Sequence, residues 1–151
     1  MNKQQSGFTL IETVIYIALF SIVIFGGIVG SYNIIEGSNK NSEDIKIQKE
    51  SLFINRKISW ALTNANSITI SNLGKTLTIS RPDLNNESPI IITEAGSIIT
   101  LSRGANPSSF LNNNRYKISD LIFEYDILQK SVSVEYKIKD RNFSYTKYLL
   151  N

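Results

Sequence analysis

The chain has 151 residues, a formal net charge of +3 at pH 7, and neither cysteine nor histidine. A chain of this length has room for one small soluble domain once an apolar N-terminal helix is set aside. Without cysteine it has no disulfide, and without either residue type it lacks the commonest general base and the commonest strong nucleophile. The small net charge does not indicate a polyanionic partner. Composition therefore disfavours an enzyme and predicts no catalytic residue and no cofactor.

An apolar run near the N-terminus contains one charge. From Phe8 to Ile35 the only charged side chain is that of Glu12. A carboxylate well inside a membrane helix costs roughly 2.5–3.5 kcal/mol on insertion scales, so such a residue normally has a partner. No basic residue follows Glu12 within helical reach. The nearest cation that the chain can offer is a new amino group, made by a cut just before Phe8.

This arrangement resembles the N-terminus of type IV prepilins and of the pseudopilins of type II secretion. In that family a short basic leader ending in glycine is removed, and the new N-terminus is methylated. The resemblance implies that residues 1–7 are the leader, with Lys3 holding it on the cytoplasmic side. It also implies cleavage between Gly7 and Phe8, methylation of Phe8, and pairing of Glu12 with the Phe8 ammonium group of a neighbouring subunit.

The N-terminal segment has two other interpretations. A secretory signal peptide has an apolar stretch of roughly 7–15 residues followed by a small-residue cleavage site. Here the run is longer, and Ile28-Val29-Gly30 is a poor substitute for such a site. A plain single-pass anchor fits the length, since roughly 20 apolar residues span a bilayer. It leaves Glu12 and the Gly7-Phe8 pair without a role.

Residues 8–32 are apolar on all sides, as a lipid-embedded or bundle-buried helix requires. Gly26, Gly27 and Gly30 interrupt this segment. One interpretation is close packing of small residues against a neighbouring helix. The other, implied by the resemblance, is a weak point where the helix loosens during filament assembly.

Residues 33–64 are predicted to form an amphipathic helix. Its apolar residues recur at spacings of seven and four and are Ile47, Ile54, Ile58 and Leu62, with Leu52 and Trp60 nearby. This spacing places one face of the helix against the domain that follows. Residues 36–44 are polar and contain Gly37, so a continuous helix and a kinked one are equally favoured. Asn41 or Ser42 would serve as the start of a second helix.

From Ser67 onward the apolar residues alternate with polar ones, which predicts strands. We expect about seven short antiparallel strands in residues 65–151, around residues 68–70, 77–79, 89–93, 97–102, 117–126, 131–138 and 143–150. Turn residues at 72–75 and 94–96 predict hairpins, and 104–109 a loop. The predicted class is α+β: a long N-terminal helix, membrane-embedded in its first half and amphipathic in its second, packed on an antiparallel β domain. The last half of the chain, in which paired strands end in the segment from Tyr116 to Phe123 and further apolar strands follow, looks like the J-type minor pseudopilins.

Two further clusters are candidate binding sites. The loop residues Asp83, Asn85, Asn86 and Glu87 suit calcium in type, but they lack the spacing of an EF-hand. Four basic residues are candidates for a nucleic-acid edge near Tyr116, namely Arg81, Arg103, Arg115 and Lys117. An ordinary exposed surface is the favoured interpretation of the second cluster. We therefore predict no metal site and do not expect a nucleic acid as partner.

The predicted organisation is a leader (1–7), a membrane and assembly helix (8–32), an amphipathic helix (33–64) and a β-rich domain (65–151). The resemblance implies a minor pilin or pseudopilin of a type IV pilus or type II secretion-like filament. Its implied partners are other subunits, the prepilin peptidase and the inner-membrane assembly platform. It would span the inner (cytoplasmic) membrane once, with its C-terminal domain outside the cytoplasm, and reach a filament or the cell surface. Two alternatives are a DNA-uptake or surface-binding pilus-tip module, and a membrane-anchored β domain with no assembly role.

Overall fold

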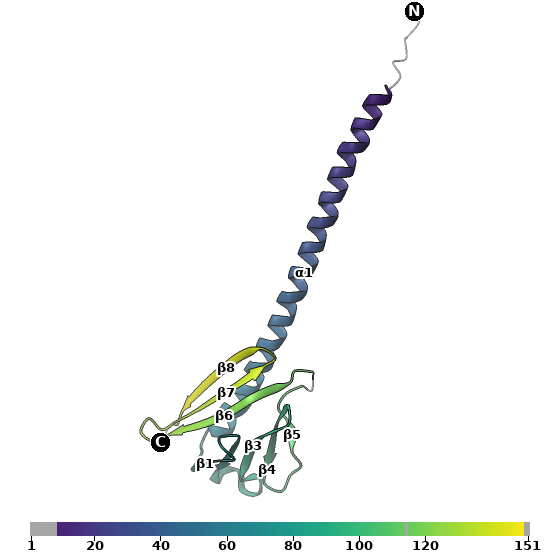
Figure 1. The fold of residues 1–151 in the computed structure, drawn as a ribbon. Helices are drawn as coiled ribbons and strands as arrows, with labels where there is room; N and C mark the ends of the chain where they lie inside the picture. Colours follow the sequence, from purple (N-terminus) through teal and green to yellow (C-terminus); the bar gives the residue numbers. More distant parts are fainter. Residues whose placement is uncertain (1–8, 114, 150–151) are drawn as a thin grey trace, which may run out of the picture. The chain divides into compact units, whose positions relative to one another are not determined.

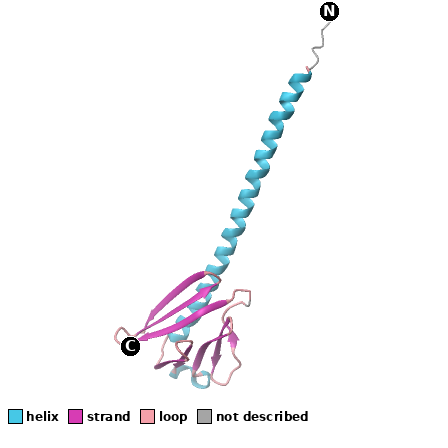
Figure 2. Ribbon diagram, viewed as in Figure 1, coloured by secondary structure: helices cyan, strands magenta, loops and turns pink. Residues whose placement is uncertain are grey.

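The computed structural model describes residues 9–113 and 115–149 (Figure 1). Within them, helix α1 (Leu10–Leu62) comes first and β strands follow (Figure 2). The strands are β1 (Ser67–Ser71), β2 (Thr76–Ser80), β3 (Ile90–Ala95), β4 (Ile98–Arg103), β5 (Ser109–Phe110), β6 (Ile118–Asp126), β7 (Ser131–Ile138) and β8 (Arg141–Tyr148), with the 3₁₀ helix η1 (Pro82–Glu87) between β2 and β3. This confirms the predicted α+β class.

The chain divides into two units, residues 1–44 and residues 45–151. In the described part of the first unit, the backbone is helical from Leu10 onward. Residues 36–44 are helical throughout, and α1 does not begin again at Asn41 or Ser42. An ion pair of 2.9 Å between Lys40 and Glu36 (Nζ to Oε1), one helical turn apart, supports this polar stretch. Of the two possibilities left open by the sequence, the continuous helix is therefore the one observed.

The part of α1 in the second unit has one buried face. The residues on it are Ile47, Ser51, Ile54, Ile58, Ala61 and Leu62. The four apolar positions predicted from the spacing are confirmed, whereas Leu52 and Trp60 remain partly exposed. Ser51 and Ala61 were not predicted, because small side chains carry little hydrophobic signal. On a buried helix face, small side chains allow the helix backbone to lie close to its neighbours.

The strands form two antiparallel sheets, one in the order β1-β2-β3-β4-β5 and the other in the order β6-β7-β8. The predicted hairpin at residues 72–75 is confirmed, since Ser71 pairs with Thr76. The next turn is shorter than predicted, because Ala95 pairs with Ile98 across a two-residue turn. Gly96 in that turn has φ +70, a conformation that glycine adopts without strain.

Two short elements were missed by the sequence analysis. Strand β5 is only two residues long, begins at the last residue of the expected loop 104–109, and pairs with β4. Helix η1 was read as a plain polar loop, although Pro82 at its start is a residue that favours a first helical turn. Elements of this length contain too few residues for a period to be recognised.

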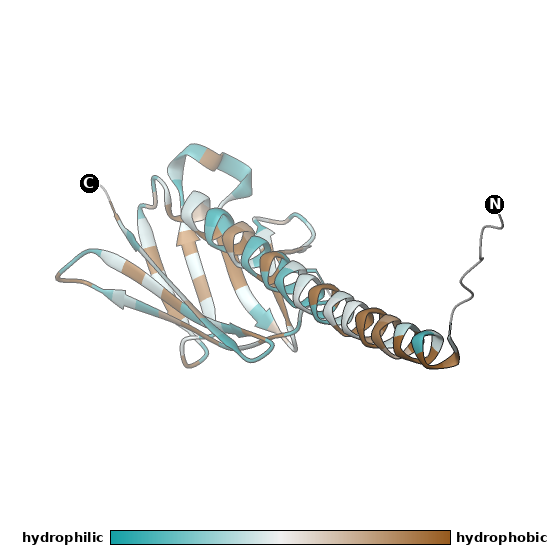
Figure 3. Cartoon of the chain, turned by 90° about the horizontal axis from the view of Figure 1, so that it is seen from above, coloured by the Kyte–Doolittle hydropathy of each residue, from teal (hydrophilic) through white to brown (hydrophobic). Residues whose placement is uncertain are grey.

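The core lies in the second unit, where alternate residues of both sheets and the buried face of α1 meet. Figure 3 shows hydrophobic and hydrophilic residues alternating along the strands. A β-bulge between Ser119 and Ile122, with φ +55 at Asp120, changes which residues of β6 face inward. Ile118 is buried before the bulge, and Leu121 and Phe123 are buried after it. One extra residue therefore keeps both ends of a long strand in the same core.

A buried polar cluster joins α1 to the second sheet. The hydroxyl of Tyr136 lies 2.9 Å from Ser51 Oγ and donates to Asn55 Oδ1 at 2.9 Å. Ser51 and Tyr136 are both buried. Because buried polar groups are costly when they lack partners, this cluster fixes the position of α1 against β7.

Replacing Tyr136 with phenylalanine tests this cluster. We expect Tyr136→Phe to lower the free energy of unfolding by about 1–3 kcal/mol, because Ser51 and Asn55 lose a buried partner. Denaturant unfolding of the full chain in detergent measures this change. Tyr148→Phe, which changes an exposed tyrosine on β8, is the matched control and should leave the free energy nearly unchanged.

The same variant should also change how the stability of the protein depends on pH in the alkaline range. Burial raises the pKa of Tyr136 from its ordinary value of 10.0 to about 12. The folded state therefore favours the neutral phenol. The contribution of this phenol to the free energy of unfolding is complete below about pH 10 and is lost between about pH 10 and pH 12. We expect this loss in the parent chain and a smaller one in Tyr136→Phe. Equal alkaline losses in both proteins would contradict the assignment.

Candidate functional site

Of the predicted site residues, only Glu12 lies in the described part of the chain. Lys3, Gly7 and Phe8 fall outside the described residues. Glu12 is in the first turn of α1, two residues after the helix begins at Leu10. The geometry of the site is therefore the geometry of Glu12 and its helical neighbours.

Thr9 and Glu12 form the start of α1. The backbone N–H of Glu12 donates to Thr9 Oγ1 at 3.4 Å and to the Thr9 carbonyl at 3.1 Å. Thr-x-x-Glu is the spacing of a capping box, with threonine as the N-cap and glutamate three residues later. The signal is present in the sequence as Thr9-Leu10-Ile11-Glu12. A carboxylate here also lies at the positive end of the helix dipole.

The Glu12 carboxylate accepts a side-chain hydrogen bond from within its own helix. The hydroxyl of Tyr16, one turn further on, donates to Glu12 Oε1 at 3.4 Å. The ion pairs found among the described residues do not include Glu12. A long hydrogen bond from one neutral hydroxyl satisfies only part of a carboxylate, which has about four acceptor positions. The carboxylate can therefore accept a cation from outside the described residues.

Around Glu12 the helix surface is apolar and uncovered. Helix α1 is long and apolar enough to cross a membrane, and no residue in its candidate membrane-spanning window is buried. Hydroxyl groups within this part donate to helix carbonyls, as Ser21 Oγ does to Ile17 at 2.7 Å and Ser31 Oγ to Gly27 at 2.9 Å. Exposed apolar surfaces of this extent mark a membrane or protein contact.

The three glycines of this segment are also uncovered. A Cβ atom added at Gly26, Gly27 or Gly30 would meet no atom within 4 Å in the described chain. These glycines therefore leave room for the close approach of a neighbouring helix, as in helix pairs that pack through small residues. Neither of the two interpretations given for them from the sequence is decided by this observation.

These features define an α+β chain whose N-terminal helix is suited to a membrane or a helical bundle. A family model described as the prokaryotic N-terminal methylation motif matches residues 2–28. The prepilin-type resemblance of the N-terminus is thereby confirmed. No curated protein and no solved structure matches the chain.

The candidate calcium loop is occupied by ion pairs. Asp83 and Glu87 belong to η1, where Asp83 pairs with Arg81 and Glu87 with Arg103, the second pair at 3.0 Å. The hydrogen bond from Arg81 lowers the pKa of Asp83. Among the described residues, no group of three or more carboxylate, histidine or cysteine side chains is placed to hold a metal ion.

The candidate basic edge is not a set of free cations. Arg81 is buried, and its guanidinium donates to the Trp60 carbonyl at 2.7 Å and lies 5.2 Å from the centre of the Trp60 ring. It thus caps the last turn of α1, where helix carbonyls lack partners and the dipole favours a cation. Arg103 pairs with Glu87, and Tyr116 is buried. Arg81 therefore has a structural role that its sequence position did not reveal.

A variant at Arg81 separates this role from an interaction role. We expect Arg81→Ala to lower the free energy of unfolding by about 2 kcal/mol, because a charged hydrogen bond at the end of α1 is lost. Arg115→Ala removes an exposed cation and should change the free energy very little. Denaturant unfolding of both full chains in detergent makes the comparison. A stable Arg81→Ala protein would show that Arg81 does not hold the helix end.

Proposed function

We propose that this chain is a structural subunit, a minor pilin or pseudopilin, of a type IV pilus or type II secretion-like filament. It is inserted once in the inner membrane with its β domain outside the cytoplasm. The prepilin peptidase removes residues 1–7 and methylates Phe8, and the assembly platform transfers the subunit into a filament. The observation that carries this proposal is the match of residues 2–28 to the methylation motif, with Glu12 as the one charge of the apolar run.

The assembly step rests on the chemistry of two charges. In lipid, the Glu12 carboxylate and the new ammonium group at Phe8 are each costly. When the subunit enters a helical bundle, lipid contact is exchanged for helix contact, and Glu12 meets the Phe8 ammonium of a neighbour. A subunit in the wrong register leaves both groups buried without partners, which is strongly unfavourable. The pair therefore selects the register of assembly.

The most direct test is N-terminal peptide mapping and intact mass of the protein from membranes that contain its native peptidase. The proposal predicts a chain that begins at N-methylated Phe8. A chain that still begins at Met1 would make this a membrane-anchored β domain. A cut near Gly30 would make it a secreted β domain, and the assembly step would then be wrong.

Glu12→Leu tests the charge pair. We expect the variant to be cleaved normally but to be incorporated into filaments about a hundredfold less, since a lost pair of about 3 kcal/mol corresponds to that ratio. Glu12→Gln keeps the shape and removes the charge, so it should fail in the same way. Thr13→Val, the next position along, is the control and should be incorporated. Immunoblots of sheared filaments against membranes measure incorporation.

Gly7→Ala tests the cleavage site. We expect this variant to retain residues 1–7 and to remain in the membrane, because the resemblance places the cut directly after Gly7. Ser6→Ala, one residue earlier in the leader, is the control and should be processed. The measurement is again the N-terminal peptide. Normal processing of Gly7→Ala would place the cut elsewhere.

A further inference from the structure

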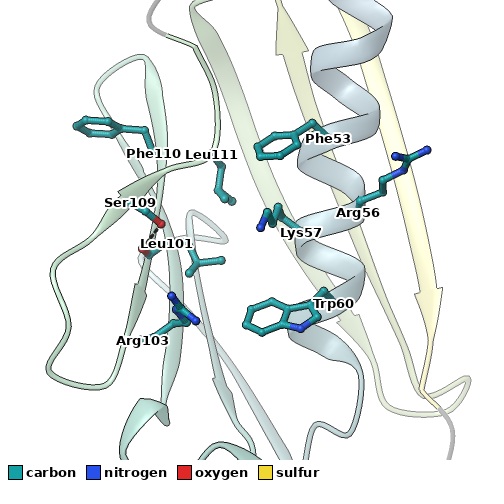
Figure 4. A pocket seen from close by; sticks show the side chains of 9 residues that line it. All are labelled: Phe53, Arg56, Lys57, Trp60, Leu101, Arg103, Ser109, Phe110 and Leu111. Carbon is teal, nitrogen blue, oxygen red and sulfur yellow. Dashed lines mark hydrogen bonds between the residues drawn. The ribbon is translucent and has the colours of Figure 1, made fainter.

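A groove lies in the second unit, between α1 and the edge of the first sheet. Its volume is about 610 Å³, and it is lined by Phe53, Arg56, Lys57, Trp60, Leu101, Arg103, Ser109, Phe110 and Leu111. Figure 4 shows Phe53, Lys57 and Trp60 facing Leu101 and Leu111 across the gap, while Arg56 points away. Phe53 and Trp60 keep 46% and 39% of their surface exposed. We call this feature the aromatic groove.

The charge of the aromatic groove is positive. Lys57 Nζ lies 5.6 Å from the centre of the Phe53 ring, and among the described residues it makes no ion pair. Arg103, on the opposite wall, is already paired with Glu87 at 3.0 Å. An apolar floor with a free lysine beside it fits an apolar group that carries a carboxylate.

The same chain exposes such a group elsewhere. At the β6–β7 turn, Ile127 and Leu128 are 74% and 95% exposed. Asp126 Oδ1 accepts the backbone N–H groups of Leu128 and Gln129 at 2.8 and 3.0 Å, so the turn is held in one shape. Glu124 is exposed on the adjoining strand and, among the described residues, makes no ion pair. We call residues 124–129 the hairpin tip.

We propose that the hairpin tip of one copy of this chain inserts into the aromatic groove of a second copy. The apolar side chains of Ile127 and Leu128 cover Phe53 and Trp60, and the acidic side of the tip faces Lys57. Within the second unit, Figure 1 places the β6–β7 turn and β5 on opposite sides, so the contact joins different copies. Because the two surfaces differ, a copy that receives a tip in its groove still has its own tip available for another copy, so the contact can extend beyond two copies.

The absence of cysteine from the sequence makes disulfide trapping direct. Two versions of the full chain are expressed together, one with Ser109→Cys in the groove and the other with Gln129→Cys at the tip. Mild oxidation in membranes should give a disulfide-linked dimer that contains one of each. Leu73→Cys, at the exposed β1–β2 turn, replaces Gln129→Cys in the matched control and should give little of it. Equal cross-linking in the two pairs would overturn the proposal.

Charge reversal tests the polar part of the contact. We expect Lys57→Glu in the groove version to reduce the cross-linked fraction about tenfold, since juxtaposed like charges oppose association. Glu124→Lys in the tip version should restore it. Failure of the restoring variant, with both chains folded by circular dichroism, would show that Lys57 does not face this tip.

A different occupant would give a different result. A single-stranded oligonucleotide that is retained by the full chain in detergent, and released by Lys57→Glu, would assign the groove to nucleic acid if no specific cross-link forms. Cross-linking and the N-terminal residue of the chain are measured on the same samples. A specific cross-link in chains that begin at Met1 would contradict the proposed processing and support the groove contact, so the two failures are distinguishable.

Discussion

A carboxylate at the start of an apolar helix is the constraint on which the rest of this structure depends. Thr9 caps the helix, and the helix dipole and the Tyr16 hydroxyl each stabilise Glu12 in part. Dipole effects at exposed helix ends are worth about 0.3–1 kcal/mol, whereas a carboxylate in lipid costs roughly 2.5–3.5 kcal/mol. The local interactions are therefore too weak to account for Glu12 in a membrane. In a membrane, a cation from another part of the same chain or from a neighbour would have to supply the difference.

The two parts of helix α1 differ in whether their apolar side chains are buried. Residues 45–62 place their apolar stripe in the core of their own β domain, where Ile54 and Ile58 are fully buried and Tyr136 bonds to Ser51 and Asn55. In the candidate membrane-spanning window of the first unit, no side chain is buried. Since the second part already has its partners, the large apolar surface left over is that of the first part. Membrane insertion and helix bundling both cover that surface, which is why one helix can serve in both environments.

The sequence predicted the parts of the fold that repeat. The positions of Ile47, Ile54 and Ile58 follow from the helical period, and the strands follow from alternation. Features that depend on one contact were missed: β5 exists because it pairs with β4, and the bulge at Asp120 is visible only through its partner strand. Arg81 was read as a surface cation because nothing in its neighbourhood along the chain indicates Trp60. In the candidate site, the motif around Glu12 was readable because cleavage position, spacing and apolar run coincide locally.

Two contacts of different strength have different tasks in such an assembly. Packing of the apolar helices is the larger contact, but it is nearly uniform along the helix and identifies a partner poorly. The proposed Glu12 pair would add register, and a contact between the hairpin tip and the aromatic groove would add a choice of neighbour. Once helices hold two subunits together, a second contact forms at a high effective concentration and can be weak in isolation. A small groove beside Lys57 would then be sufficient, because it would have to distinguish neighbours that are already side by side.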